Sequence, residues 1–227
     1  MDQPQNNFKY AAIFDVDGTM VDNASYHQNA WIALDKRYDL AITPEYYLAN
    51  IHSRSNDKNV RKLFPDAGSD EFINRISKEK ESIYRSTFRP VLKEIPGLTN
   101  LIKELSRQNI PCAAASNSPK ANVDMVLDEL DIRKYFSVII DRDQVTAGKP
   151  NPEILLTTAK QLAHPPQNCI VFEDSLSGFK AAQNAKMPYI VITAGAKKQE
   201  LKHAKNPIAT YHDFTKITPE SIKNLLT

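Results

Sequence analysis

Carboxylates, a lysine and hydroxyl groups follow several short apolar runs of this sequence, at the point where each run ends. These polar segments are Asp15-Val16-Asp17-Gly18-Thr19, Ser116-Asn117-Ser118, Lys149-Pro150 and Glu173-Asp174. Clustered carboxylates repel one another and need a hard cation, and their oxygen atoms favour Mg²⁺. If the segments converge in the fold, the sequence therefore predicts a magnesium site.

Phosphoryl transfer is the chemistry that this set of side chains favours. A carboxylate can attack phosphorus and form an aspartyl-phosphate. The transferred group carries negative charge, which Mg²⁺, Lys149 and neutral donors such as Ser116 and Asn117 would stabilise. A second carboxylate is then needed to protonate the leaving oxygen and later to activate water.

Each segment also has a purely structural interpretation. An Asp-x-Asp-Gly sequence can be a surface turn, a single lysine is usually solvated, and acidic residues are favourable at helix N-termini. A calcium loop is excluded, because Thr19 follows Gly18 and no ligand spacing continues. The joint occurrence of the segments, each after its own apolar run, favours the chemical interpretation.

The elements that would position these residues alternate along the chain. The short apolar runs cover 10–14, 111–115, 136–140, 169–172 and 189–193, and their length favours buried strands. Helical patterns separate most of them, for example Leu98, Leu101, Ile102 and Leu105 on one face. Because alternating strands and helices form a parallel sheet covered on both faces, the carboxyl ends of these strands should share one edge.

One stretch breaks the alternation. Between Asp22 and about Leu92 there are helical patterns and no convincing strand. We therefore predict an α/β fold: a doubly wound, Rossmann-like parallel sheet core with an inserted α-helical cap domain. The predicted core spans 1–22 and 93–227, and the predicted cap spans 23–92.

Composition narrows the class of protein. The chain has 227 residues, of which 41% are hydrophobic and 25% charged, with a net charge of +2. This near balance predicts no nucleic-acid or membrane partner. No apolar run approaches the roughly 20 residues that span a bilayer, and the polar start of the chain predicts a cytoplasmic protein.

The four segments, in this order, resemble the motifs of the haloacid dehalogenase superfamily. The resemblance implies that Asp15 is the nucleophile, that Asp17 is the general acid/base, and that Ser116 and Lys149 contact the phosphoryl group. It also implies that Mg²⁺ is held by Asp15, by the backbone carbonyl of Asp17 and by Asp174, with Glu173 beside them. True dehalogenases lack the second aspartate, which is present here as Asp17.

Within the superfamily, the chain is similar to β-phosphoglucomutase and to related sugar-phosphate phosphatases. The cap segment from Tyr26 to Trp31 carries their His-x-x-Ala-Trp pattern, and Arg54 and Lys80 match cap cations that we expect to lie on helices. The implied substrate-binding residues are Asn117, His27, Trp31, Arg54 and Lys80. In the mutase, the histidine that matches His27 links cap closure to the acid/base aspartate. Trp31 at helical spacing is also typical of a packed core.

Together these residues predict a Mg²⁺-dependent phosphatase that hydrolyses a small phosphate monoester, above all a sugar phosphate. We expect the enzyme to be a monomer. The first alternative is a phosphosugar isomerase of the β-phosphoglucomutase type. Alternatives from other classes are a phospho-accepting receiver, against which the cap and Asp17 argue, and a non-catalytic binding protein, against which the complete motif set argues.

Cys112 and Cys169 lie within two of the apolar runs, and we expect both thiols to be reduced. The usual strand order of the superfamily would place the first strand between them. Neighbouring strands lie about 4.8 Å apart, so the gap of two strands would be too wide for a disulfide.

Overall fold

The structure, a computed structural model, describes residues 10–52, 54–66 and 68–226. The chain divides into two compact units, one formed by Met1–Asp22 with Lys93–Thr227 and the other by Asn23–Leu92. The polar start of the chain, which we use above to predict its location, lies outside the described residues. None of the helices in the described ranges is both long and apolar enough to cross a bilayer.

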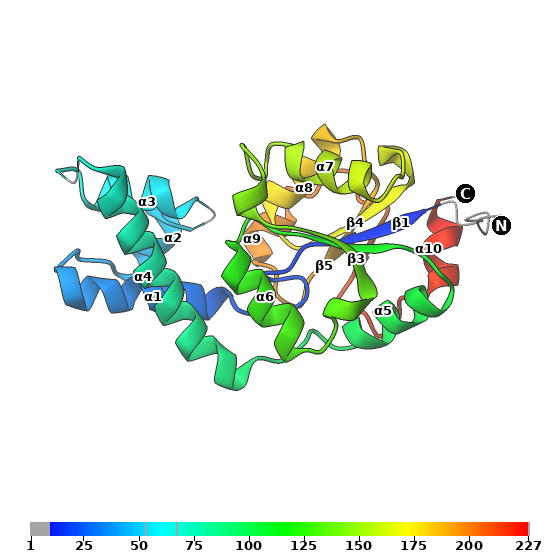
Figure 1. Ribbon diagram of the computed structural model, residues 1–227, viewed down its shortest axis with the longest axis horizontal. Helices are drawn as coiled ribbons and strands as arrows, with labels where there is room; N and C mark the ends of the chain where they lie inside the picture. Colours follow the sequence, from blue (N-terminus) through cyan, green and yellow to red (C-terminus); the bar gives the residue numbers. More distant parts are fainter. Residues whose placement is uncertain (1–9, 53, 67, 227) are drawn as a thin grey trace. The chain divides into compact units, whose positions relative to one another are not determined.

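The first unit is built on a sheet of six strands, all parallel to their neighbours, in the order β3-β2-β1-β4-β5-β6 (Figure 1). The strands are β1 (Ala11–Phe14), β2 (Cys112–Ala115), β3 (Phe136–Ile140), β4 (Cys169–Glu173), β5 (Tyr189–Ile192) and β6 (Ala209–Tyr211). The central strands are buried along their whole length, as expected when helices cover both faces. The predicted doubly wound fold is therefore confirmed.

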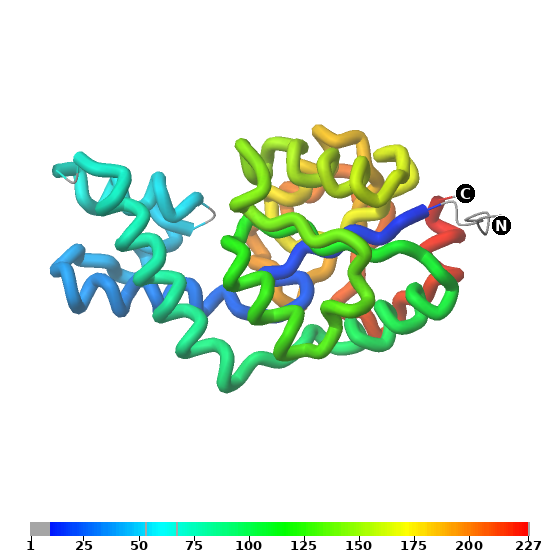
Figure 2. The backbone as a smooth tube through the Cα atoms, in the orientation of Figure 1, coloured from blue at the N-terminus to red at the C-terminus, as the bar shows by residue number. Residues whose placement is uncertain are grey.

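The helices of this unit alternate with the strands, and Figure 2 traces the path of the chain through them. They are α5 (Leu98–Arg107), α6 (Lys120–Glu129), α7 (Glu153–Gln161), α8 (Leu176–Asn184), α9 (Lys198–Leu201), α10 (Pro219–Leu225) and the 3-10 helices Arg133–Tyr135, Arg142–Gln144 and Pro166–Asn168. The apolar face predicted for the first of them is buried in α5.

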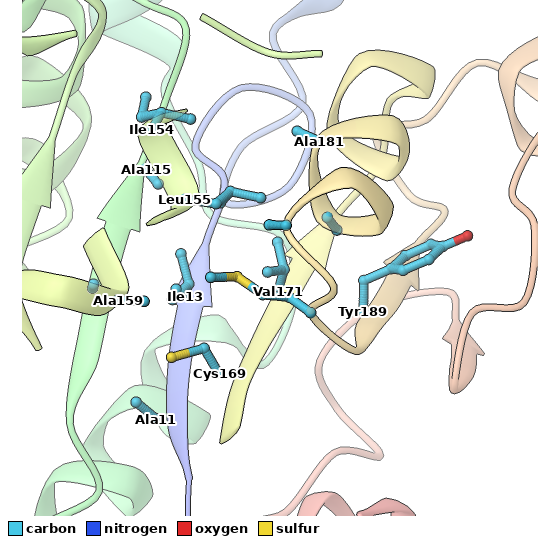
Figure 3. Packing of buried hydrophobic residues seen from close by; sticks show 14 of the residues in the cluster. Ala11, Ile13, Ala115, Ile154, Leu155, Ala159, Cys169, Val171, Ala181 and Tyr189 are labelled. Atoms are coloured by element: carbon cyan, nitrogen blue, oxygen red, sulfur yellow. The ribbon is translucent and has the colours of Figure 1, made fainter. Parts of the chain in front are cut away.

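One hydrophobic cluster lies between the sheet and the helices α7 and α8 (Figure 3). Ile13 and Val171 contribute from neighbouring strands, Leu155 from α7 and Ala181 from α8. The alternate residues of the same strands point to the other face, where Phe14 stacks on Phe172 at 4.6 Å between ring centroids.

The two cysteines confirm the predicted strand order. Cys112 pairs in register with Ala12 of β1, and Cys169 pairs with Ala11 on the other side of the same strand. Because successive residues of a strand point to opposite faces, the two thiols lie on opposite faces of the sheet. Both are buried and free.

The order of the strands creates a switch point between β1 and β4. The chain passes from β1 towards β2 on one side and from β4 towards β5 on the other. In open parallel sheets, ligands bind at the carboxyl ends of the strands at such a point. Asp15 directly follows β1, and Glu173 is the last residue of β4.

The chain leaves the first unit and returns to it through two segments that pair with each other. Val21 forms an antiparallel bridge with Glu94, and the Ile95 N–H donates to the Met20 carbonyl at 2.8 Å. The Ile95 N–H and the Met20 carbonyl thereby satisfy each other.

The second unit contains helices and connecting loops, and no strand, among its described residues. It consists of α1 (Ala24–Tyr38), α2 (Pro44–Asn50), α3 (Asn56–Leu63), α4 (Asp70–Phe88) and a 3-10 helix (Arg89–Val91). The Thr43 and Ser69 side chains cap α2 and α4 by accepting backbone N–H groups. Its core includes Trp31, which is only 2% exposed.

Two features of the local structure go beyond or against the predictions from sequence. β6 was not among the predicted strands, because Ala209–Tyr211 is short and only partly buried and so lacks an apolar run. The prediction that Arg54 lies on a helix was wrong, because α3 begins at Asn56 and the exposed Arg54 side chain lies in the preceding turn.

Candidate active site

Three acidic side chains meet at the carboxyl edge of the sheet. Asp15, Glu173 and Asp174 are buried, and each offers an oxygen atom within 4.8 Å of the others. Such a set consists of oxygen donors only and carries a surplus of negative charge. It therefore fits a hard divalent cation such as Mg²⁺.

Lys149 lies inside this cluster. Its Nζ donates to Asp15 Oδ1 at 2.6 Å, to Glu173 Oε1 at 2.6 Å and to the Ala115 carbonyl at 2.8 Å. Burial lowers the pKa of Lys149, but the two carboxylates outweigh burial and raise it above its usual value. The lysine therefore stays charged and links β1, β2 and β4 at their carboxyl ends.

One ammonium group does not balance three carboxylates. Burial, and then repulsion from Glu173, raise the pKa of Asp15 from 3.8 to about 8, although Lys149 acts in the opposite direction. Burial also raises the pKa of Asp174, with Glu173 and Asp15 adding to the effect. A bound divalent cation would relieve this repulsion and favour the ionised carboxylates.

The turn from β4 into α8 fixes Glu173. Its Oε2 accepts the N–H groups of Asp174 and Ser175 at 3.1 Å and 3.3 Å and the Ser175 hydroxyl at 3.2 Å. The carboxylate also lies against Gly178, where a methyl group would place its carbon 1.8 Å from Glu173 Cδ. Only glycine at position 178 leaves room for this carboxylate.

The loop after β1 brings Thr19 and Gly18 against Asp174. Thr19 Oγ1 donates to Asp174 Oδ1 at 3.1 Å. Gly18 has a φ of 84° and passes so close to Asp174 that a side chain on Gly18 would collide with the carboxylate. The glycine and the threonine together define where the Asp174 carboxylate lies.

Asp17 contacts two hydroxyl groups at the end of β2. Asp17 Oδ2 accepts from Ser116 Oγ at 3.2 Å and from Ser118 Oγ at 2.6 Å. Ser116 Oγ also accepts the N–H of Ser118 at 3.0 Å, which holds the turn together. The second carboxylate is thus held by neutral donors, whereas Asp15 contacts the lysine.

Asn117 acts on the backbone of Lys149. Its Nδ2 donates to the Lys149 carbonyl at 3.0 Å, and its Oδ1 accepts the Lys149 N–H at 2.8 Å. The contact of Asn117 with substrate stays a prediction, and both amide atoms of its side chain position the lysine backbone.

With this geometry established, comparisons with known proteins show what the chain resembles. Residues 12–192 match the family described as haloacid dehalogenase-like hydrolase. The chain is 31% identical over 178 residues to a phosphorylated carbohydrates phosphatase of Thermotoga maritima, covering 77% of this chain and 81% of the relative. This chain belongs to the haloacid dehalogenase-like hydrolase family. It is an enzyme, a hydrolase, as the sequence analysis predicts.

Two further likenesses place this hydrolase within the family. It is 26% identical over 195 residues to the chloroplastic 5-amino-6-(5-phospho-D-ribitylamino)uracil phosphatase of Arabidopsis thaliana, covering 86% of this chain but only 52% of that relative. The chain thus spans about half the length of the plant protein. A β-phosphoglucomutase structure from Clostridium difficile matches with a TM-score of 0.78 and 27% identity, over 95% of this chain and 96% of that one.

Two of the predicted substrate-binding residues of this hydrolase lie together in the helical unit. Lys80 Nζ contacts His27 Nδ1 at 2.8 Å and Glu81 Oε1 at 2.9 Å, and Lys80 is only 3% exposed. Because an ammonium group can only donate, His27 Nδ1 accepts this hydrogen bond. The His27 ring also stacks on Tyr84 at 3.8 Å. Lys80 is therefore a buried, paired cation rather than a surface lysine.

The other two cap predictions fall in different surroundings. Arg54 is exposed, whereas Trp31 packs in the core of the helical unit with the Lys80 ammonium 5.9 Å from its ring centroid. The burial of Trp31 favours a packing role over contact with substrate. The substrate contacts assigned to both residues stay predictions.

Three residues with no predicted role also shape the site of this hydrolase. Ser118 and Thr19 donate to its carboxylates, and Gly178 leaves room for Glu173. Ser118 and Thr19 stand inside the segments singled out above, directly after predicted strands. Gly178 gave no signal, because only the path of the Glu173 side chain shows why a glycine is needed there.

Proposed function

We propose that this hydrolase is a Mg²⁺-dependent phosphatase that cleaves a small phosphate monoester, a sugar phosphate, through a phosphorylated Asp15. The observation that carries the proposal is the contact of Lys149 with both Asp15 and Glu173 at the switch point of the sheet. A lysine held in a buried acidic cluster neutralises part of its charge and offers a positive group to an incoming phosphate.

The residues of the chain have separate tasks in this reaction. An oxygen of Asp15 attacks phosphorus, the ester oxygen leaves, and Asp17 gives that oxygen a proton. Asp17 then takes a proton from water, which attacks the phosphorylated Asp15 and releases inorganic phosphate. Lys149 and Ser116 contact the phosphoryl oxygens, and Asn117 holds the lysine in place.

Mg²⁺ would be held by Asp15, the Asp17 carbonyl and Asp174, with Glu173 beside them, and would supply positive charge for the transferred phosphoryl group. The buried, oxygen-only cluster supports this assignment. The sugar-phosphate substrate rests on the relative whose name refers to phosphorylated carbohydrates. A small phosphorylated metabolite is thus the proposed partner, and the enzyme is proposed to act as a cytoplasmic monomer.

The test is a turnover screen of phosphorylated sugars and nucleotides, combined with mass spectrometry of acid-quenched enzyme. We expect release of inorganic phosphate, a phosphate adduct on Asp15, and loss of both with Asp15→Asn or with EDTA. Activity that survives either change would contradict the mechanism.

A mutase of the β-phosphoglucomutase type is the second candidate, favoured by the structural match reported above. It would form the same phosphoenzyme but return the phosphoryl group to another sugar hydroxyl. Incubation with β-glucose 1-phosphate and a bisphosphate primer separates the two. Formation of glucose 6-phosphate without inorganic phosphate would favour the mutase and overturn the phosphatase.

A further inference from the structure

The loop that follows β5 passes directly beside the acidic cluster. Gly195 in this loop lies so close to the chain at Gly18 that a methyl group on Gly195 would place its carbon 2.3 Å from the Gly18 carbonyl oxygen. Gly18 in turn touches the Asp174 carboxylate. The loop is therefore in contact with the backbone that shapes the site.

The same loop leads to Glu200, whose side chain reaches the start of α8. Glu200 Oε2 accepts the N–H of Leu176, the first residue of that helix, at 2.7 Å. Leu176 is two residues after Asp174 in the sequence. The N-terminal amides of a helix lack partners within the helix, so an outside carboxylate can fix the turn that carries Asp174.

The turn from β4 to α8 is thus held from two sides. Glu173 accepts the N–H groups of Asp174 and Ser175, and Glu200 accepts the next N–H, that of Leu176. Three consecutive backbone amides are therefore bound by two carboxylates. Without Glu200, the turn would keep the contacts of Glu173 and the Ser175 cap, whose Oγ accepts the Gly178 N–H at 3.2 Å, but the Leu176 N–H would lose its carboxylate.

Glu200 also adds negative charge near the cluster. After burial, Glu173 and Asp15, repulsion from Glu200 contributes to the raised pKa of Asp174. Lys197 in the same loop interacts with Glu200, which raises the pKa of Lys197 against the larger, lowering effect of burial. The loop therefore brings an acidic side chain towards the cluster and a basic side chain close to that acid.

We propose that Glu200 is a positioning residue of the metal site, which fixes Asp174 through the Leu176 N–H and raises the affinity for Mg²⁺ by its charge. This inference rests on the proposed function, because it takes the acidic cluster as the Mg²⁺ site. Residues that hydrogen-bond to metal ligands orient those ligands and adjust the affinity of the site for the metal. Their loss typically weakens metal binding by about 10–100-fold. The simpler interpretation is that Glu200 only caps α8.

Calorimetric titration of the metal-free protein with Mg²⁺ separates these interpretations. Glu200→Ala removes both the acceptor and the charge, and we expect about a tenfold or larger increase in the dissociation constant. Glu200→Gln keeps an acceptor oxygen for Leu176 and should weaken binding less, with no loss of melting temperature. Lys197→Met, which removes the opposing charge, should bind Mg²⁺ as tightly as the wild type or more tightly. Exposed Gln199→Ala is the control.

Three outcomes would overturn the inference. They are an unchanged dissociation constant in both Glu200 variants, a change in Glu200→Ala alone that parallels a loss of melting temperature, and weaker binding in Lys197→Met. Asp174→Asn serves as the reference for a damaged site. If the wild type itself binds no Mg²⁺, the proposed metal site fails rather than the role of Glu200.

Discussion

The carboxylate of Glu173 occupies the space that a side chain at Gly178 would need. A methyl carbon on Gly178 would lie within 2.1 Å of Cδ and of both carboxylate oxygens of Glu173. Glu173 has little freedom to move aside, because Lys149, Ser175 and two backbone N–H groups all donate to it. The first turn of α8 and the acidic cluster are thus sterically coupled.

We expect Gly178→Ala to displace the Glu173 carboxylate and release Lys149 from one of its partners. Overpacking of this kind typically costs about 1–3 kcal/mol of stability. Turnover should fall at least about tenfold, as expected when groups that orient metal ligands are disturbed. Thermal unfolding measures the loss of stability, and steady-state kinetics measure the loss of turnover. Gly68→Ala is the control, because nothing lies within 4 Å of its added methyl group.

Ser118 should support the second carboxylate. Its hydroxyl donates to Asp17 Oδ2 at 2.6 Å, so Ser118→Ala removes one of the donors that hold Asp17. We expect a rate loss of about tenfold, smaller than the roughly 10²–10⁴-fold loss expected for Asp17→Asn as a general acid/base. Rapid-quench measurement of phosphoenzyme formation and breakdown checks the step affected. Ser118→Thr retains a hydroxyl, and a defect equal to that of Ser118→Ala would contradict the assignment.

Acid should weaken the helical unit through Glu81. Burial opposes ionisation of Glu81, but Lys80 and the Asn56 amide outweigh it and lower the pKa of Glu81 from 4.5 to about 2. Because the folded state holds this proton less tightly than the unfolded state, the stabilisation is complete above pH 4.5 and is lost as the pH falls towards 2. It is on the order of 3 kcal/mol, since one pKa unit corresponds to about 1.4 kcal/mol.

The free energy of unfolding of the wild type and of Glu81→Gln, measured from about pH 5 to about pH 2, gives this contribution. This range covers roughly the interval between the unfolded and folded pKa values of Glu81. The wild type should lose more stability with acid than the variant. Parallel curves for the two proteins would show that Glu81 is not stabilised in the folded state.

His27→Ala should lower the melting temperature. The change removes the ring that stacks on Tyr84 and leaves the buried Lys80 ammonium with one acceptor fewer. A buried polar group that loses a partner typically costs about 1–3 kcal/mol. Thermal unfolding tests this, with the exposed His203→Ala as the control.

The same variant tests the predicted role of His27 in selectivity. A larger loss of kcat/KM for the sugar phosphate than for p-nitrophenyl phosphate would support that role. Equal losses for both substrates would show that His27 only packs in the helical unit.

The sequence was sufficient for the sheet core because its central strands are buried on both faces. Strands such as Ala11–Phe14 appear as apolar runs, and chemistry-bearing residues follow them directly. The strand order could not be derived from the runs and came from the family resemblance. The edge strand Ala209–Tyr211 could not be predicted, because a strand at the edge of a sheet is less buried and so contains fewer apolar residues.

Contacts between side chains were the part that the sequence could not supply. The pattern put Ser116, Asn117 and Lys149 at one edge, but not the two hydrogen bonds by which Asn117 holds the Lys149 backbone. The helical pattern puts Lys80 on a helix but does not show that its ammonium group contacts His27 and Glu81. Glu200 stands far from every motif and is brought to α8 only by the fold of its loop.

The antiparallel pairing of Val21 with Glu94 has a consequence for how this enzyme can change over evolution. Because the two segments leave and re-enter the sheet unit as neighbours, everything between them can be lengthened, exchanged or deleted without pulling the strands apart. Short surface connections tolerate such insertions at little entropic cost. We therefore expect the helical unit to be replaceable, so that a chain in which a brief glycine-serine turn joins the two segments should still form the parallel sheet.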